Sequence, residues 1–259
     1  MEIKYQFLDT SYIPELHACW MESFKDYQVD MSYLTIERMR SRARMDRVDF
    51  SLSVGAFDSD KMIGFLLIGI DRIDRQLTAF DSGTGVIEEY RGNGVAGGML
   101  NFAISKLKFV GIEKFLLEVL QENKPAIKAY QKAGFSTNRD FNCYKLKTKN
   151  FHHKESYENN VEIKSFDKEE LSNYLFLLDW DVSWEYTYSA IDSIEEDLII
   201  DGAFINYECV GFMVFYPTLN WIFMLAIKDG FQAKEIEGSL IANLLARMNH
   251  EVSEIKFNN

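Results

Sequence analysis

The sequence predicts an α/β protein made of two mixed-sheet domains with the same layout, the second of which is truncated. Three observations support this prediction. Strand and helix patterns alternate along the chain, a segment of the first half recurs in the second half, and a polar stretch without periodicity separates the halves. We therefore expect a first domain over residues 1–147, a linker over residues 148–160 and a second domain over residues 161–259.

The first half alternates between strand and helix signals. Pro14 stands near the first turn of an expected helix, where proline is well tolerated. Phe50, Leu52 and Val54 then alternate with small or polar residues, which is typical of a half-buried strand. The expected order is strand 4–8, helices 12–26 and 32–45, strands 50–56, 62–70 and 77–87, helix 95–107, strand 115–120, helix 125–132 and a terminal hairpin over 135–146. This order describes a mixed α/β layer.

The second half starts the same pattern again. The segment Gly55–Phe65 reappears as Gly202–Phe212, with Gly-Ala-Phe at the start and Gly-Phe at the end of both copies. The flanking patterns agree as well: we expect a strand over 161–166, an apolar strand over 221–227, an amphipathic helix over 236–248 and a strand over 252–257. These elements predict a second copy of the fold that lacks the last helix and hairpin.

The net charge of −12 is unevenly distributed. Residues 1–150 carry 21 Lys and Arg against 20 Asp and Glu, whereas residues 151–259 carry 7 against 20. With no extended basic face to neutralise phosphates, the sequence predicts no binding of nucleic acid. Five arginines lie within residues 37–47. We interpret this run as a solvated helix face, with a patch for an acidic ligand as the alternative.

Other features point to a cytoplasmic protein that binds neither membrane nor metal. The longest apolar stretches are shorter than a membrane span, and the N-terminus lacks a secretory signal pattern. Cys19, Cys143 and Cys209 form no C-x-x-C pair, which fits free thiols in a reducing compartment. The four histidines do not stand at metal-ligand spacing from a second His or Cys, so we expect no metal site.

The stretch Tyr-Arg-Gly-Asn-Gly-Val-Ala-Gly-Gly over residues 90–98 predicts a backbone anion site at a helix start. Gly92, Gly94 and Gly97 fit the dinucleotide spacing G-x-G-x-x-G, whereas Arg91, Gly94 and Ala96 fit R-x-x-G-x-A. A dinucleotide fingerprint needs its first glycine directly after a buried strand, but four polar or aromatic residues intervene here. Because no Gly-Lys-Ser/Thr follows, the stretch is not a P-loop either. We therefore favour the second spacing.

Two motifs carry a family resemblance. Residues 84–96, Thr-Gly-Val-Ile-Glu-Glu-Tyr-Arg-Gly-Asn-Gly-Val-Ala, resemble the acetyl-CoA motif of the GNAT-type N-acetyltransferases. Farther along, Asn123-x-x-Ala126-x-x-x-Tyr130-x-x-x-Gly134-Phe135 resembles the second signature of that superfamily. The resemblance covers residues 1 to about 147 and implies acetyl-CoA as cosubstrate. One departure is a glutamate at position 88, where many members carry proline.

The glycine loop suits the diphosphate of CoA. A turn made of Gly92, Asn93 and Gly94 leaves no bulky side chain between the phosphates and the backbone amides. The helix expected to begin near Val95 adds the positive end of its dipole, and Ala96 keeps the first turn open. Arg91 is expected either to contact the diphosphate or to be solvated.

The strand before the loop is the expected place of the pantetheine arm. Gly83 and Gly85 inside this strand predict a bulge or a ligand lying against the backbone. The resemblance implies that pantetheine runs beside Val86 and Ile87, where a backbone N–H polarises the thioester carbonyl. Asn123 is expected to bond the pantetheine or to cap the following helix.

Acyl transfer from a thioester needs a proton donor for the leaving sulfur and a base for the amine. By resemblance, Tyr130 is the candidate general acid, with a core tyrosine as the alternative. Asp81 is the candidate base, and Glu118 in the next strand is a second one; each has a solvent-facing strand residue as its alternative.

The two copies are expected to differ in cofactor binding. In the second copy Glu235 stands for Gly94 and Glu237 for Ala96, so two carboxylates would face the diphosphate. We expect an acetyl-CoA-dependent N-acetyltransferase, active in its first domain alone, that acetylates a primary amine of a small molecule or a protein. The alternatives are a non-catalytic acyl-CoA-binding or regulatory module and a nicotinamide-dependent dehydrogenase.

Overall fold

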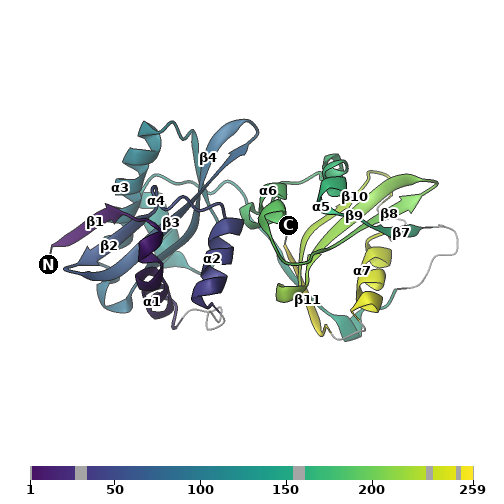
Figure 1. The fold of residues 1–259 in the computed structure, drawn as a ribbon, viewed down its shortest axis with the longest axis horizontal. Helices are drawn as coiled ribbons and strands as arrows, with labels where there is room; N and C mark the ends of the chain where they lie inside the picture. The colour runs from purple at the N-terminus through teal and green to yellow at the C-terminus, as the bar shows by residue number, and fades with distance from the viewer. Residues whose placement is uncertain (1, 27–33, 154–160, 232–235, 249–251, 259) are drawn as a thin grey trace. The chain divides into compact units, whose positions relative to one another are not determined.

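The computed structural model describes residues 2–26, 34–153, 161–231, 236–248 and 252–258. The chain divides into two compact units, residues 1–138 and 139–259. Each unit is built on one mixed β-sheet with helices packed against it, as Figure 1 shows from the purple N-terminus to the yellow C-terminus. The α/β class and the two mixed sheets predicted from the sequence are thereby confirmed.

The first unit holds a five-stranded sheet in the order β1-β2-β3-β4-β5. Its elements are β1 (Ile3–Phe7), α1 (Ile13–Ser23), α2 (Ile36–Met45), β2 (Val54–Asp58), β3 (Lys61–Ile73), β4 (Gln76–Val86), α3 (Val95–Phe109), β5 (Lys114–Leu117) and α4 (Lys124–Lys132). Neighbouring strands are antiparallel except β4 and β5, which are parallel. This parallel pair makes the sheet mixed.

The parallel pair β4 and β5 separates before β4 ends. Pairing runs from Thr78 with Lys114 to Asp81 with Leu117, whereas β4 continues to Val86. After Asp81, the edge of β4 that faces away from β3 therefore has no partner strand among the described residues. A strand edge of this kind can pair with an extended ligand.

Helices α1 and α3 cover opposite faces of this sheet. Trp20 of α1 stacks on Phe65 with ring centroids 4.9 Å apart, and both rings pack against β4. A Cβ atom added to Gly83 would lie 2.7 Å from Trp20, and one added to Gly85 would lie 2.5 Å from Phe65. Close aromatic packing thus requires both glycines. The sequence-based expectation of a ligand against them is not needed to explain them.

The second unit holds a six-stranded sheet in the order β6-β11-β10-β9-β8-β7. Its elements are β6 (Cys143–Lys147), β7 (Glu162–Ser165), α5 (Lys168–Ser172), α6 (Tyr188–Ser193), β8 (Ile199–Ile205), β9 (Glu208–Tyr216), β10 (Trp221–Ile227), α7 (Ile236–Arg247) and β11 (Glu254–Asn258). Strands β10 and β11 are parallel, like β4 and β5. The sheet thus repeats the first one and carries β6 as an additional edge strand.

The end of the first domain differs from the prediction. No hairpin forms over residues 135–146; residues 135–142 carry no strand, and β6 pairs antiparallel with β11 along its full length. Tyr144 of β6 stacks on Phe257 of β11 with ring centroids 6.2 Å apart. Because β6 gains its partner in the second sheet, the unit boundary falls after Asn138 rather than at residue 147.

The repeated Gly-Ala-Phe segment adopts the same irregularity in both units. In the first, Ala56 pairs with Gly64 and the next residue pairs with Met62, so one residue of β3 is skipped. In the second, Ala203 pairs with Gly211 and the next residue pairs with Cys209. The same β-bulge therefore follows the same sequence motif in both sheets.

A second bulge lies one strand farther on and aligns β4 with β10. The pairing of β4 with β3 skips Ser82, and the pairing of β10 with β9 skips Phe223. Asp81 and Ile222 are the last residues before these bulges, and each is also the last residue paired with the parallel neighbour, β5 or β11. Asp81 and Ile222 thus occupy equivalent positions.

Among the described residues, no helix has the length and apolar character needed to cross a membrane.

Candidate active site

The glycine loop of the first unit forms an open backbone cradle at the start of α3. Gly92 and Gly94 have φ angles of +78° and +80°, the left-handed region that favours glycine. Gly94 caps the helix without a side-chain hydrogen bond, and a Cβ atom at Gly92, Gly94 or Gly97 would meet no atom within 4 Å. Among the loop and cap backbone hydrogen bonds of the described residues, none is donated by the amides of residues 92–97. They are therefore available to an anion.

Gly98 has a different role from the other glycines of the loop. A Cβ atom at this position would overlap the hydroxyl of Tyr5 on β1. Gly98 thus allows α3 to pack closely on β1, while the amides at the helix start face open space. The adjacent residues Val95 and Ala96 begin the helix, with Val95 buried in the core.

The open edge of β4 presents Val86 rather than Ile87. The Ile87 amide donates a hydrogen bond to the Ile63 carbonyl at 3.0 Å, so it is used within the sheet. Successive residues of a strand direct their backbone groups to alternate sides, so the N–H and C=O of Val86 point away from β3. The Val86 carbonyl accepts a bond from Nε of Arg91 at 3.0 Å, and Arg91 Nη2 donates to the Ser23 carbonyl at 2.6 Å. Arg91 thus links the β4 edge to the end of α1.

Asp81 and Tyr130, the two residues assigned to catalysis from the sequence, lie in contact. The Tyr130 hydroxyl donates to Oδ2 of Asp81 at 3.0 Å. Thr84 Oγ1 donates to the same oxygen at 2.7 Å, and the Gly83 amide donates to Oδ1 at 3.0 Å. Asp81 is only 6% exposed and lies at the point where β4 and β5 separate.

The surroundings of Asp81 act on its charge in opposite directions. Burial raises the pKa of Asp81 from 3.8 to about 6, because the ionised carboxylate loses its hydration. The hydrogen bonds from Thr84, Tyr130 and the Gly83 amide lower this pKa, since each stabilises the negative charge. With a pKa of about 6, Asp81 exchanges a proton near neutral pH, as acid–base catalysis requires.

Helix α4 carries Tyr130 to this position. Asn123 caps the helix, since its side-chain oxygen accepts a bond from the Ala126 amide at 3.3 Å. The Tyr130 ring packs edge-on against Phe135 with centroids 5.8 Å apart. Tyr130 is half-buried at the margin of the core, with its hydroxyl directed to Asp81.

The other carboxylates considered from the sequence lie elsewhere. Glu118 is exposed just after the end of β5. Glu88 forms an exposed ion pair with Lys25 at 3.4 Å, which fits a loop surface residue. No group of three or more His, Cys, Asp or Glu side chains that could hold a metal ion occurs in the part of the chain that the structure describes.

Two polar residues near Asp81 were not assigned from the sequence. Thr84 is the first residue of the motif over residues 84–96, and this position could have marked it as a candidate site residue. Ser82, the bulged residue, donates to Oδ2 of the buried Asp46 at 2.5 Å. Asp46 ends α2, 36 residues earlier, and no local pattern announces such a contact.

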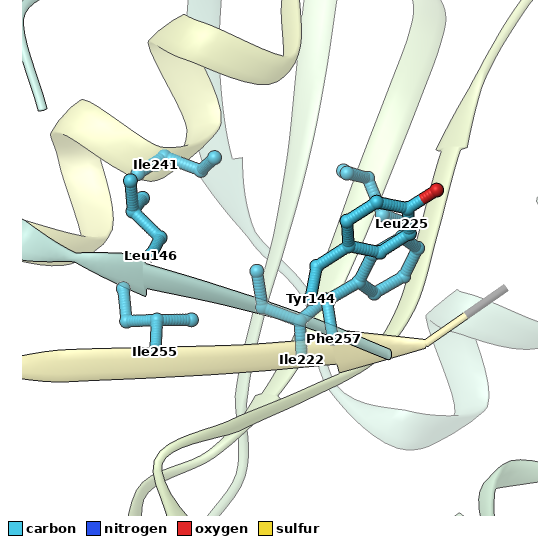
Figure 2. Close-up of a pocket in the computed structure, with 7 residues that line it drawn as sticks. All are labelled: Tyr144, Leu146, Ile222, Leu225, Ile241, Ile255 and Phe257. Carbon is cyan, nitrogen blue, oxygen red and sulfur yellow. The ribbon is translucent and has the colours of Figure 1, made fainter. Parts of the chain in front are cut away.

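The second unit replaces these polar groups with apolar ones. By the bulge alignment, Ile222 stands for Asp81 and Leu225 for Thr84. Figure 2 shows both side chains among those lining an apolar cavity of about 160 Å³. The complete lining is Tyr144, Leu146, Ile222, Leu225, Ile241, Ile255 and Phe257.

The start of α7 is also unlike the start of α3. Gly238, which aligns with the open Gly97, is covered by the ring of His153; a Cβ atom there would lie 2.6 Å from Nδ1. The His153 Nε2 lies 3.4 Å from Oγ of Ser239. Glu237 stands in the first turn of α7, and Glu235 lies outside the described residues.

The open backbone cradle at the start of α3 is the feature that the acetyl-CoA motif over residues 84–96 predicted. Residues 10–135 match the model of the acetyltransferase (GNAT) family, and the first unit belongs to this family. A stretch of 52 residues is 40% identical to mycothiol acetyltransferase of Corynebacterium aurimucosum. It covers 20% of this chain and 17% of that relative, so less than a fifth of the relative is matched.

Solved structures share the fold over both units. A GCN5-related N-acetyltransferase from Sphaerobacter thermophilus has a TM-score of 0.73 at 12% identity, covering 99% of this chain and 86% of that one. A glucosamine N-acetyltransferase region of a fungal β-N-acetylglucosaminidase also scores 0.73, at 13% identity, over 98% of this chain and 35% of that one. A probable N-acyltransferase from Enterococcus faecalis scores 0.66 at 10% identity, over 100% and 66%.

Proposed function

We propose that this protein transfers an acetyl group from acetyl-CoA directly to a primary amine, and that its first unit performs the reaction. The observation that carries this proposal is the contact between Tyr130 and Asp81 at the split between β4 and β5. An acid and a base are the two groups that aminolysis of a thioester needs, and here they lie in one buried cluster.

In this proposal the cradle at Gly92, Asn93 and Gly94 binds the diphosphate of CoA, assisted by the amides of Val95 and Ala96. A Cβ atom at Gly92 or Gly94 would meet no atom within 4 Å, and the helix dipole adds favourable potential for an anion.

The pantetheine arm then extends along the open edge of β4. Val86 offers it a backbone N–H, and Asn123, which caps α4, is a second candidate to bond it. Arg91 donates to the Val86 and Ser23 carbonyls and so keeps the loop next to the β4 edge.

The bound thioester would lie with its sulfur next to Tyr130. The amine attacks the carbonyl carbon, the C–N bond forms, and the C–S bond breaks. Tyr130 protonates the leaving thiolate, and Asp81 receives the proton that the amine loses. In this scheme the Val86 N–H would polarise the thioester carbonyl.

The second unit, in this proposal, neither binds CoA nor reacts. The ring of His153 covers the first turn of α7, and the acid–base positions hold Ile222 and Leu225. Glu237 adds a negative charge where the diphosphate would have to lie. A calorimetric titration of the whole chain with CoA should therefore give one site.

The acceptor is a small-molecule or protein amine. The alternative function is that of a non-catalytic acyl-CoA-binding module, which needs the cradle but not the Asp81–Tyr130 pair. The presence of that pair favours the enzyme. The deciding experiment measures free-thiol release from acetyl-CoA with a panel of primary amines that includes glucosamine, amino-sugar thiols, polyamines and peptide N-termini. CoA binding without thiol release for any amine would favour the binding module. Thermal stabilisation by NAD but not by CoA would favour a dehydrogenase.

A further inference from the structure

The hydrogen bond between Tyr130 and Asp81 restricts what the tyrosine can do. A tyrosine hydroxyl has a single proton to donate. With Asp81 ionised, that proton is directed to Oδ2 of Asp81 at 3.0 Å. Tyr130 can direct its proton to a sulfur only if it gives up this bond, or if Asp81 carries a proton and becomes the donor to the tyrosine oxygen.

We propose that Asp81 is the proton source that recharges Tyr130, and that Thr84 is a positioning residue that holds Asp81 for this exchange. The inference rests on the proposed acetyl transfer. Asp81 and Tyr130 then act as one proton path from the amine to the sulfur rather than as two independent groups.

Each proton that one group of this path loses is gained by the next group. The amine nitrogen forms its bond to the acetyl carbon and loses one proton to Asp81. Protonated Asp81 then donates to the Tyr130 oxygen, which turns the O–H of Tyr130 toward the thiolate. The tyrosine proton passes to the sulfur as the C–S bond breaks, and the Asp81 proton passes to the tyrosine. Both residues return to their starting states.

Thr84 is assigned its role by the oxygen that it contacts. Its hydroxyl donates at 2.7 Å to Oδ2, the same oxygen that accepts the Tyr130 hydroxyl. The Gly83 amide meanwhile holds Oδ1, so the carboxylate cannot rotate without losing bonds. Both hydroxyls thus donate to one oxygen, and the bond from Thr84 favours the charged form of Asp81.

Few other titratable groups face Asp81 from the surrounding elements. Its strand partners are Ile68 on β3 and Leu117 on β5, and α4 contributes Tyr130. On the opposite face of the sheet, Asp46 bonds to the neighbouring Ser82. Burial raises the pKa of Asp81 by more than the three hydrogen bonds lower it, and the resulting pKa of about 6 keeps both protonation states accessible near neutral pH.

The first test reads Asp81 directly and needs no acceptor. The Asp81 carboxyl carbon is followed by NMR from about pH 4 to about pH 9 in the wild type, Thr84→Val and Thr84→Ser. Loss of one hydrogen bond to the charged form should raise the midpoint in Thr84→Val by about one pH unit. Thr84→Ser, which keeps the hydroxyl, should bring the midpoint back toward that of the wild type. Identical midpoints in wild type and Thr84→Val would overturn the role of Thr84.

The second test follows catalysis with an amine that the wild type acetylates. In Thr84→Val the acid limb of kcat should move upward with the NMR midpoint, while KM for acetyl-CoA stays within about twofold. Asp81→Asn should lose kcat about 100-fold, because an amide cannot relay a proton. As a matched control, Asp9→Asn changes an exposed carboxylate that accepts from Ser11, outside the cofactor motifs, and should keep kcat.

The two levels of failure can be told apart. If the wild type acetylates no amine, the proposed function fails, whatever the NMR titration shows. If the wild type is active and Asp81→Asn keeps its kcat, the proton path through Asp81 is wrong and the acetyltransferase stands. CoA binding measured for every variant by calorimetry verifies that the folded site is intact.

Discussion

The phenolic oxygen of Tyr130 lies 3.0 Å from Oδ2 of Asp81, although 49 residues separate the two in the chain. Tyr130 lies near the C-terminal end of α4, and Asp81 is the last residue of β4 that pairs with β5. The contact forms because α4 packs beside α3 and closes over the point where β4 and β5 separate. Through this contact, the candidate acid Tyr130 and the candidate base Asp81 form one hydrogen-bonded cluster.

Replacing Tyr130 with phenylalanine should slow acetyl transfer without weakening acetyl-CoA binding. The ring contact with Phe135 is kept, and only the proton donor is lost. We expect kcat to fall about 100-fold and the Kd for acetyl-CoA to change less than about threefold. Tyr12→Phe, which removes a phenol bonded to Gln6, is the matched control and should leave kcat unchanged. An unaltered rate for Tyr130→Phe would rule out its role as the acid.

A negative charge in the first turn of α3 should abolish CoA binding. Gly94 itself is a poor site for this test, because its φ of +80° makes any side chain strained. Ala96→Glu instead copies Glu237 of the second unit without backbone strain. Repulsion of about 3 kcal/mol at an effective dielectric constant of about 20 predicts a loss of affinity of about 100-fold or more. Ala96→Gln has the same size without the charge and should bind much more tightly than Ala96→Glu. Equal affinities for the two would place the diphosphate elsewhere.

The raised pKa of Asp81 should appear in the pH dependence of stability. Folding raises this pKa from 3.8 to about 6, so the folded state binds the proton more tightly than the unfolded state. Wild-type stability should therefore fall as the pH rises from about 4 to about 6, by about 3 kcal/mol from this group. Asp81→Asn lacks this contribution. Urea unfolding at about pH 4 and about pH 8 should show the variant gaining on the wild type by that amount. Parallel pH profiles for the two proteins would contradict the raised pKa.

Two glycines of the first unit should respond oppositely to alanine. Gly85→Ala places a methyl group 2.5 Å from Phe65, which is fully buried and stacked on Trp20. We expect a loss of about 1–3 kcal/mol in the free energy of unfolding. Gly97→Ala lies in a helix with no atom within 4 Å and should gain up to about 1 kcal/mol. Urea denaturation of both variants measures the difference, and a stable Gly85→Ala would show that the aromatic pair can move aside.

The sequence by itself determined the elements and the anion cradle. Strand alternation, helical periodicity and glycine spacing are local properties, so β4, α3, β10 and α7 could be located within a few residues of their observed bounds. The internal repeat could also be recognised in the sequence, because both copies carry the same Gly-Ala-Phe segment at the same β-bulge. The cradle could be read because its geometry depends on glycine conformation and a helix start that lie within a few consecutive residues.

Tertiary structure decided the features that depend on distant partners. The strand β6 joined the second sheet because β11 offered it an edge and aromatic contact, which no local pattern reveals. The glycines of β4 are required by the close packing of Trp20 and Phe65. The charge state of Asp81 depends on its burial and on the hydrogen bond from Tyr130, which lies far along the chain. Burial, desolvation and long-range hydrogen bonds exist only once the chain has folded, and these set the chemistry of the site.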